Sequence, residues 1–128
     1  MEPRHNDYKA LLVMINESQA RRLEEFLDSI KFYFYTVEHK VERVVSEKIR
    51  HKNSLLWPGS DCLFSMLVPD RRLETLLSQL KAFRMALPEG VIMSAVVSPI
   101  VGLVPSFYKE DIPYDKELTE ELKKKFVR

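Results

Sequence analysis

The order of apolar and polar segments predicts an α+β domain, in which a strand, a helix and a strand are followed, after a long polar loop, by a second such set. Three apolar runs lack the alternation of a strand with one solvent-exposed face, which indicates strands covered on both sides. Between them, two segments repeat apolar residues at helical spacing. The order is centred on residues 55–70, where a Trp-Pro-Gly turn ends the loop and leads through an apolar strand to Pro69 and Asp70.

Composition is that of an ordinary single domain. The chain has 128 residues, of which 45% are hydrophobic and 30% charged, and a length of this order suits one compact unit. A net charge of +1 argues against a protein that binds nucleic acid by charge alone. The single Cys62 allows no internal disulfide and fits a reducing compartment. Neither a signal peptide nor an apolar run long enough to span a membrane is visible, so we expect a cytoplasmic protein.

The first strand and helix follow a polar, flexible N-terminus at residues 1–7. Tyr8–Ile15 is apolar from Ala10 onward and predicts the first strand. Asn16 can cap a helix, and Gln19 three residues later completes a capping-box pattern. The helix then places its apolar residues on one face, at Ala20, Leu23, Phe26 or Leu27, and Ile30.

A long second strand and a basic loop come next. Phe32 to Val37 is aromatic and β-branched, which favours a strand, and we extend it to Val45. Helical pairing of valines between residues 37 and 44 is the competing interpretation. Ser46–Ser60 is then a polar loop, longer than the typical connection of about 4–6 residues, and loops of that length are usually functional or disordered.

The second half repeats the pattern. Asp61–Val68 predicts the third strand, and Asp70 is the expected N-cap of the second helix. Pro88 ends that helix, a tight turn spans residues 87–90, and Val91–Val97 is the fourth strand. We expect a loop at 98–107, a linker at 108–114 and a short helix at 115–126. The buried stripe of the second helix is predicted at Leu73, Leu76, Leu77, Leu80, Phe83 and Leu87, and the last helix aligns Leu118, Leu122 and Phe126.

This order is the split βαβ, or ferredoxin-like, arrangement, with a four-stranded antiparallel sheet and two helices on one face. We divide the chain into the N-terminus 1–7, a ferredoxin-like domain 8–107, and a linker and helix at 108–128. Neighbours such as Leu11 and Leu12, or Leu63 and Phe64, must point to opposite sides of the sheet. The second face is therefore apolar and needs a cover, either from other copies of the chain or from the C-terminal helix folded back.

A comparison of free energies indicates that an oligomer must bury more surface than the open sheet face alone. Burying about 400 Å² of apolar surface returns ~10 kcal/mol at ~25 cal/mol per Å². Association itself costs about 4–15 kcal/mol. An oligomer therefore needs extra area from the long second strand or the C-terminal tail, and we expect an oligomer.

With these elements in place, the chain resembles the PII-like signalling superfamily, relatives of the nitrogen-regulator trimers. The most specific stretch is the loop closing in Trp57-Pro58-Gly59, followed by Cys62–Asp70 leading into the second helix. The resemblance implies a homotrimer with sheets facing inward, a mobile loop at 46–60 and a small-molecule site in clefts between subunits. Of the Gly-Asp-Gly-Lys nucleotide turn of the PII proteins only Gly90 matches, and residues 46–60 hold no modifiable tyrosine, so the ligand stays unknown.

Candidate ligand-binding residues lie mainly in the loop. The cations there could converge on a phosphate or carboxylate of a small anionic ligand or protein partner, although a solvated loop is the simpler interpretation. Trp57 could form a cleft wall or anchor a partner, or pack at the strand entry. The candidates are Lys48, Arg50, His51, Lys52, Trp57 and Gly90.

Other chemistries have weaker support. No catalytic set is visible, which predicts a non-enzymatic protein, and His39 is interpreted as a lone exposed histidine. Cys62 on an apolar strand predicts an inert buried thiol, and no metal-ligand spacing accompanies it. A divalent-metal role, as in the trimeric cation-tolerance proteins that share this fold, stays open. An RNA-recognition module has the same element order, but it needs exposed aromatic residues on its third strand, where only Phe64 is available.

Overall fold

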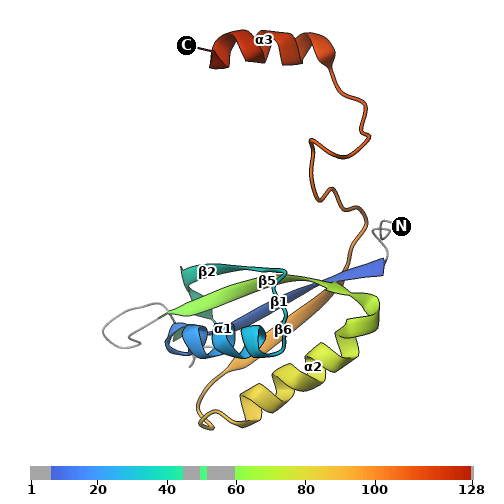
Figure 1. The fold of residues 1–128 in the computed structure, drawn as a ribbon. Helices are drawn as coiled ribbons and strands as arrows, with labels where there is room; N and C mark the ends of the chain where they lie inside the picture. Colours follow the sequence, from blue (N-terminus) through green and yellow to red (C-terminus); the bar gives the residue numbers. More distant parts are fainter. Residues whose placement is uncertain (1–6, 45–49, 52–59, 128) are drawn as a thin grey trace.

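The computed structural model describes residues 7–44, 50–51 and 60–127, and at 43–44 and 50–51 only the backbone is considered. It has one four-stranded antiparallel sheet in the order β2-β5-β1-β6, with helices α1 and α2 on one face (Figure 1). The predicted ferredoxin-like α+β fold is confirmed. The elements are β1 (Tyr8–Asn16), a 3₁₀ turn η2 (Glu17–Gln19), α1 (Ala20–Ser29), β2 (Tyr35–Val41), β5 (Asp61–Pro69), α2 (Asp70–Met85), β6 (Met93–Pro99) and α3 (Lys116–Phe126).

The core lies between the sheet and the two helices. Alternate residues of β1 and β5 are fully buried on this side, because successive side chains of a strand point to opposite faces. The predicted helical stripes face them, with Leu23 and Leu27 of α1 and Leu76 and Leu80 of α2 buried. Phe26 of α1 meets Phe83 of α2, with ring centroids 5.1 Å apart. The strand residues of this core are Leu11, Val13, Ile15, Cys62, Phe64, Met66 and Val68.

Helix α1 ends at Ser29, close to the predicted Ile30, but a cap follows it, so the predicted start of the second strand at Phe32 is wrong. Lys31 adopts a left-handed conformation with φ 58°, and its N–H bonds to the Asp28 carbonyl. The Phe32 N–H bonds to the Leu27 carbonyl at 2.9 Å, which completes a Schellman cap. Phe32 is thereby buried in the core as part of the helix cap, and β2 begins only at Tyr35.

The starts of both helices also differ from prediction. The N-cap of α2 is Pro69, and Asp70 is the first helical residue, with its carboxylate 2.6 Å from Lys9 Nζ. Asp70 at this position still complements the helix macrodipole. Asn16 accepts a hydrogen bond from the Ser18 N–H and so caps η2, but Gln19 donates to the Ser18 hydroxyl, so the expected reciprocal bond of a capping box is not made.

The face of the sheet away from the helices is apolar and open. Leu12 of β1 lies directly opposite Val96 of β6, and these side chains are 37% and 60% exposed. Leu63 and Leu67 of β5 and Met14 of β1 share this face by register. Figure 1 shows α3 clear of the sheet at the end of an extended segment, so the C-terminal helix does not fold back over this face in the single chain.

The region after β2 holds a second, small sheet. β3 (Arg43–Val44) pairs with β4 (Arg50–His51) antiparallel, so the prediction of one continuous strand to Val45 and an unstructured loop from Ser46 is wrong at these residues. Two-residue strands leave no pattern of alternation in a sequence, which explains the miss. In the part of the chain that the structure describes, the helices are too short or too polar to cross a membrane.

Candidate functional site

One end of the sheet carries the base of the long loop. The register places the last residue of β1, Asn16, beside the first residue of β5, Asp61, which also pairs with Val41 at the end of β2. The β3–β4 hairpin therefore leaves the sheet and returns to it at this end. Asp61 and Ser60 are buried there, so the return point of the loop is part of the packed structure.

Glu17 holds both ends of this loop. Its backbone N–H donates to the Ser60 carbonyl at 2.7 Å, just before β5. Its carboxylate accepts the Lys40 backbone N–H at 2.8 Å through Oε1 and lies 2.7 Å from His39 Nδ1 through Oε2. Lys40 has φ 58° and lies where the β2–β5 register shifts, so the carboxylate caps a β-bulge. A bulge of this kind turns the strand and sets the direction in which the hairpin leaves.

Cys62, the next residue on β5, is a free buried thiol that donates to the Ile15 carbonyl at 3.4 Å. The pKa of this thiol is raised to about 12, chiefly by burial and in smaller measure by the nearby Glu17, Asp61 and Glu24 carboxylates. A thiol with so high a pKa is a poor nucleophile near neutral pH. The environment of Cys62 therefore agrees with the predicted inert thiol.

The turn before β6 lies at the same end of the sheet. The Val91 N–H bonds to the Pro88 carbonyl at 3.1 Å, and Arg84 Nη2 donates to the Glu89 carbonyl at 2.8 Å. Gly90 is exposed in this turn, and a Cβ built on it would meet no atom within 4 Å. The turn is thus fixed by Arg84, while Gly90 leaves its outer surface open.

Among the predicted ligand-binding residues that the structure describes, Gly90 and the backbone of Arg50 and His51 lie at different edges of the sheet. The turn with Gly90 enters β6 at one edge of the sheet, and the hairpin hangs from β2 and β5 at the other edge. Three strand spacings, roughly 14 Å, separate the two edges. Arg50 and His51 form β4, whereas Lys48, Lys52 and Trp57 lie outside the described residues.

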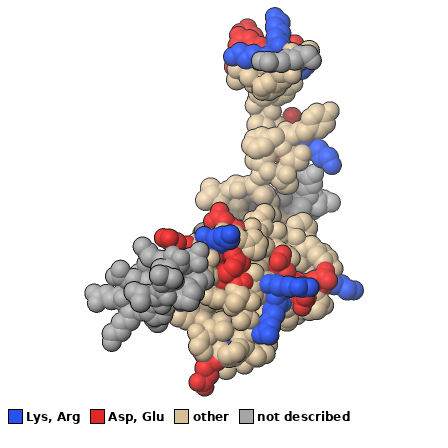
Figure 2. Space-filling model, turned by 90° about the vertical axis from the view of Figure 1, so that its left-hand side faces the viewer, with Lys and Arg blue, Asp and Glu red and all other residues tan. Residues whose placement is uncertain are grey.

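Charges at this end are mixed. Figure 2 looks onto this end of the sheet and shows Lys and Arg side chains interspersed with Asp and Glu, with no single-sign patch among the described residues. Within the described ranges, no three histidine, cysteine or acidic side chains gather closely enough to hold a metal ion. Phe64, the aromatic residue of the third predicted strand, faces the helices and is fully buried, so it offers no surface for base stacking.

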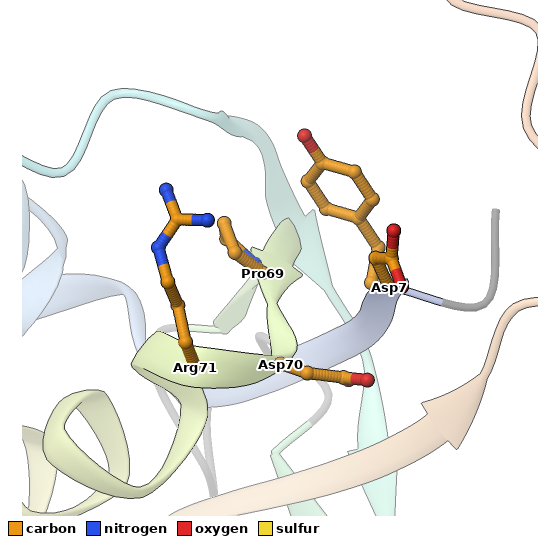
Figure 3. A pocket seen from close by; sticks show the side chains of 5 residues that line it. Asp7, Pro69, Asp70 and Arg71 are labelled. Carbon is orange, nitrogen blue, oxygen red and sulfur yellow. The ribbon is translucent and has the colours of Figure 1, made fainter. Parts of the chain in front are cut away.

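A shallow pocket of about 280 Å³ lies at the opposite end of the sheet. Asp7, Tyr8, Pro69, Asp70 and Arg71 line it, and Figure 3 shows Asp70 and Arg71 directed to different sides of it. The Asp70 carboxylate is already paired with Lys9. With one arginine and two carboxylates, the lining has no excess positive charge for an anion. None of the ligand-binding residues predicted from the sequence lines this pocket.

The sequence analysis predicts no role for Glu17 or Arg84. Glu17 contacts both ends of the loop between β2 and β5, and Arg84 holds the turn before β6. Glu17 stands in a helix start, where a carboxylate is ordinary, and its contacts to His39 and Lys40 depend on a bulge that no pattern announces. Arg84 lies near the end of α2, where a basic residue suits the helix dipole. The position of Arg84 a few residues before Pro88 and Gly90 could have indicated that its side chain reaches the turn there.

No protein-family model matches the sequence, and no curated protein is significantly similar to it. Solved structures are similar in fold. One is CPII, a nitrogen regulatory PII-like protein from Thiomonas intermedia K12 bound to ADP, AMP and bicarbonate, at 13% identity and TM-score 0.51, covering 76% of this chain and 96% of that one. A DUF3240 family protein from Shewanella baltica OS155 matches at 16% identity and TM-score 0.51, covering 77% and 96%.

A second structure of CPII, bound to ADP and bicarbonate, matches at 15% identity and TM-score 0.50, over 72% of this chain and 88% of that one. The chain is thus an α+β protein of ferredoxin-like topology. It shares its fold with PII-like proteins of solved structure, as the resemblance drawn from the sequence predicts. At these identities the likeness concerns the fold.

Proposed function

We propose that this chain is a PII-like regulatory protein that binds a small anionic ligand in clefts between three copies of itself. The observation that carries the proposal is the placement of the two loop bases. The Gly90 turn and the described strands of the β3–β4 hairpin lie at one end of the sheet but on opposite edges, which favours a cleft formed between copies over one formed within a single chain. Where neighbouring copies meet edge to edge, the turn of one copy comes beside the hairpin of the next.

The open apolar face supports assembly. Leu12 and Val96, with the half-buried Leu63 and Leu67, present an apolar surface that α3 and the other described helices leave open. Sheets packed inward in a trimer would bury it. The fold-level neighbour CPII binds ADP, AMP and bicarbonate, which supports the choice of a small anion.

In this proposal the loop at 46–60 orders over the bound ligand, and its cations Lys48, Arg50, His51 and Lys52 contact the negative charge, with Trp57 as a cleft wall. Glu17 positions the hairpin through the Lys40 bulge. The protein acts by changing its surface on binding, without catalysis, and the buried free thiol of Cys62 suits a cytoplasmic location. A divalent-metal role is the second candidate by fold analogy alone.

Isothermal titration calorimetry with ADP, AMP and bicarbonate tests this function, with Mg²⁺ alone as a separate arm. We expect at least one of the three anions to bind. Combined replacement of Lys48, Arg50 and Lys52 by alanine should weaken that binding at least tenfold, because loop cations that contact the anion are lost. Alanine at Lys123, Lys124 and Lys125 removes the same charge far from the site and is the matched control. Binding of Mg²⁺ alone, or equal affinity of both triple variants, contradicts the proposal.

A further inference from the structure

The C-terminal helix α3 has an apolar side that no other described element of the chain covers. Leu118, Leu122 and Phe126 stand four residues apart and therefore share one face. Leu118 is 48% and Phe126 78% exposed. Within residues 115–127, which the structure describes, every hydrogen bond and ion pair of α3 is internal to the helix and its caps. Helices of 11 residues are marginal alone in water, and most gain their stability from packing an apolar face.

The charges of α3 are divided along its length. Residues 115–121 carry four carboxylates and one lysine, a net charge of −3, and residues 123–125 carry three lysines, a net charge of +3. Leu122, the middle residue of the apolar stripe, stands between the two halves. In Figure 2 this helix shows both blue and red atoms at its tip, apart from the body of the protein.

We propose that α3 pairs antiparallel with α3 of a second copy of this chain. A two-fold interface must be complementary to itself, and a helix with an acidic first half, a central apolar residue and a basic second half meets this condition. In the antiparallel pair Leu118 packs against Phe126 of the second copy, and the acidic half of each helix lies beside the basic half of the other. The two helix dipoles are also antiparallel, so the positive end of each lies beside the negative end of the other. A parallel pair would place like charges side by side.

A second copy of the helix suits these charges better than the open sheet face. By register, the β1, β5 and β6 part of that face presents neutral side chains such as Leu12, Leu67 and Val96. On β2, Glu38 stands opposite Leu63 on the same face, and a carboxylate there could attract only the basic half of α3. The internal pair between Lys123 and Glu120 is 3.3 Å long and exposed, so it costs little to exchange for a partner across the pair. The pairing is independent of the inward-facing sheets of the proposed trimer and would join one assembly to another.

Charge reversal on the full chain tests the pairing by sedimentation. One variant changes Glu117, Glu120 and Glu121 to lysine, and the other changes Lys123, Lys124 and Lys125 to glutamate. Each alone should self-associate through α3 at least tenfold more weakly than the wild type, and an equal mixture should recover the association. A control reverses Glu74 and Lys81 on the exposed side of α2 and should change nothing. Association of each variant as tight as wild type, or no recovery in the mixture, overturns the proposal.

Disulfide trapping tests the direction. Cys62 is buried, so new thiols report alone. A mixture of the Leu118→Cys and Phe126→Cys chains should form the mixed disulfide, and neither chain alone should link to itself. Self-linking of Leu118→Cys without the mixed product would mean a parallel pair and contradict the proposal. Circular dichroism of each variant shows whether α3 remains helical. The same two cysteine chains, each also carrying Val96→Glu on the sheet face, should still form the mixed disulfide.

Discussion

The Nδ1 atom of His39 lies 2.7 Å from Oε2 of Glu17, so a residue that follows β1 is joined to the bulge of β2 across the intervening strand β5. The second carboxylate oxygen of Glu17 accepts the N–H of Lys40. One side chain thus fixes the point at which the hairpin leaves the sheet.

Replacing Glu17 should reveal the value of this contact. In Glu17→Ala the Lys40 N–H loses its acceptor, and we expect the free energy of unfolding to fall by about 1–2 kcal/mol. In Glu17→Gln an amide oxygen can still accept this bond, so the loss should be smaller. Urea denaturation measures both. Glu25→Ala, which removes only an exposed pair with Arg21, is the control and should change stability little. Equal losses in the two Glu17 variants would contradict this role.

The buried thiol of Cys62 predicts a dependence of stability on alkaline pH. Its pKa is raised to about 12 in the folded protein, chiefly by burial, from an ordinary value near 9.0. The unfolded chain therefore releases this proton at lower pH than the folded chain does. The stabilising contribution is complete below about pH 9 and is lost as pH rises toward 12, with a slope of at most about 1.4 kcal/mol per pH unit.

Denaturation of the wild type and of Cys62→Ala, compared from pH 8 upward, measures this contribution. We expect the alkaline loss of stability to be steeper in the wild type. Native Cys62 should also react slowly with a thiol reagent until the protein is unfolded. Parallel pH profiles for the two proteins, or rapid labelling of the native thiol, would show that the thiol ionises freely.

Lys31 holds a backbone conformation that favours glycine. Its φ of 58° is the left-handed position of the Schellman cap after α1, and its side chain is exposed. Lys31→Gly should therefore raise the free energy of unfolding by about 0.5–1 kcal/mol, since glycine occupies this region without a Cβ clash. Lys31→Ala, which keeps the Cβ, is the matched control and should give no such gain. Chemical denaturation distinguishes them, and a loss of stability in the glycine variant would contradict the cap.

Arg72 secures the same helix end from α2. Its Nη2 donates to the Ile30 carbonyl at 2.7 Å, and its guanidinium lies 5.0 Å from the centroid of the Phe32 ring. Arg72→Ala should cost about 1–3 kcal/mol, because a charged hydrogen bond and a cation–π contact are both lost. Arg72→Lys keeps the charge without the planar fork and should recover only part of this. Full recovery with lysine, measured by thermal denaturation, would mean that charge alone matters.

The strands and helices were predictable because each buries a continuous apolar run or stripe. The residues of β1, β5 and α2 carry that signal directly. In the predicted stripe of the second helix Leu76 and Leu80 are buried, and the other four residues pack partly buried against the core. The wrong predictions concern the backbone conformation at the ends of the helices. Lys31 in a left-handed cap gives no glycine signal, so Phe32 was assigned to the strand that its aromatic neighbours suggested. Asp70 resembles an N-cap, yet the chain already turns at Pro69.

The candidate site was less predictable for a related reason. Its contacts join residues far apart in sequence, such as Glu17 with His39, through a bulge whose register no alternation pattern shows. The sequence predicts a solitary His39, because the partner of this histidine lies on another element. The loop cations Lys48 and Lys52 and the wall residue Trp57 stay predictions, since they lie outside the described residues.

The open sheet face gives a final test, on assembly. Val96 is 60% exposed on that face and stands opposite Leu12 in the register. If the faces of three copies pack together, Val96→Glu places a charge in an apolar interface, where an unpaired charge is costly. We expect this variant to stay folded but to lose the trimer contact, and so to sediment no larger than the α3-paired dimer at concentrations where the wild type forms trimers. Ala95→Glu on the same edge strand points to the other side, where Ala95 is already exposed, and should keep the wild-type assembly. A monomeric wild type, or a trimer unaffected by glutamate at position 96, would show that the apolar face is not the trimer contact, and the intersubunit clefts would then lose their basis.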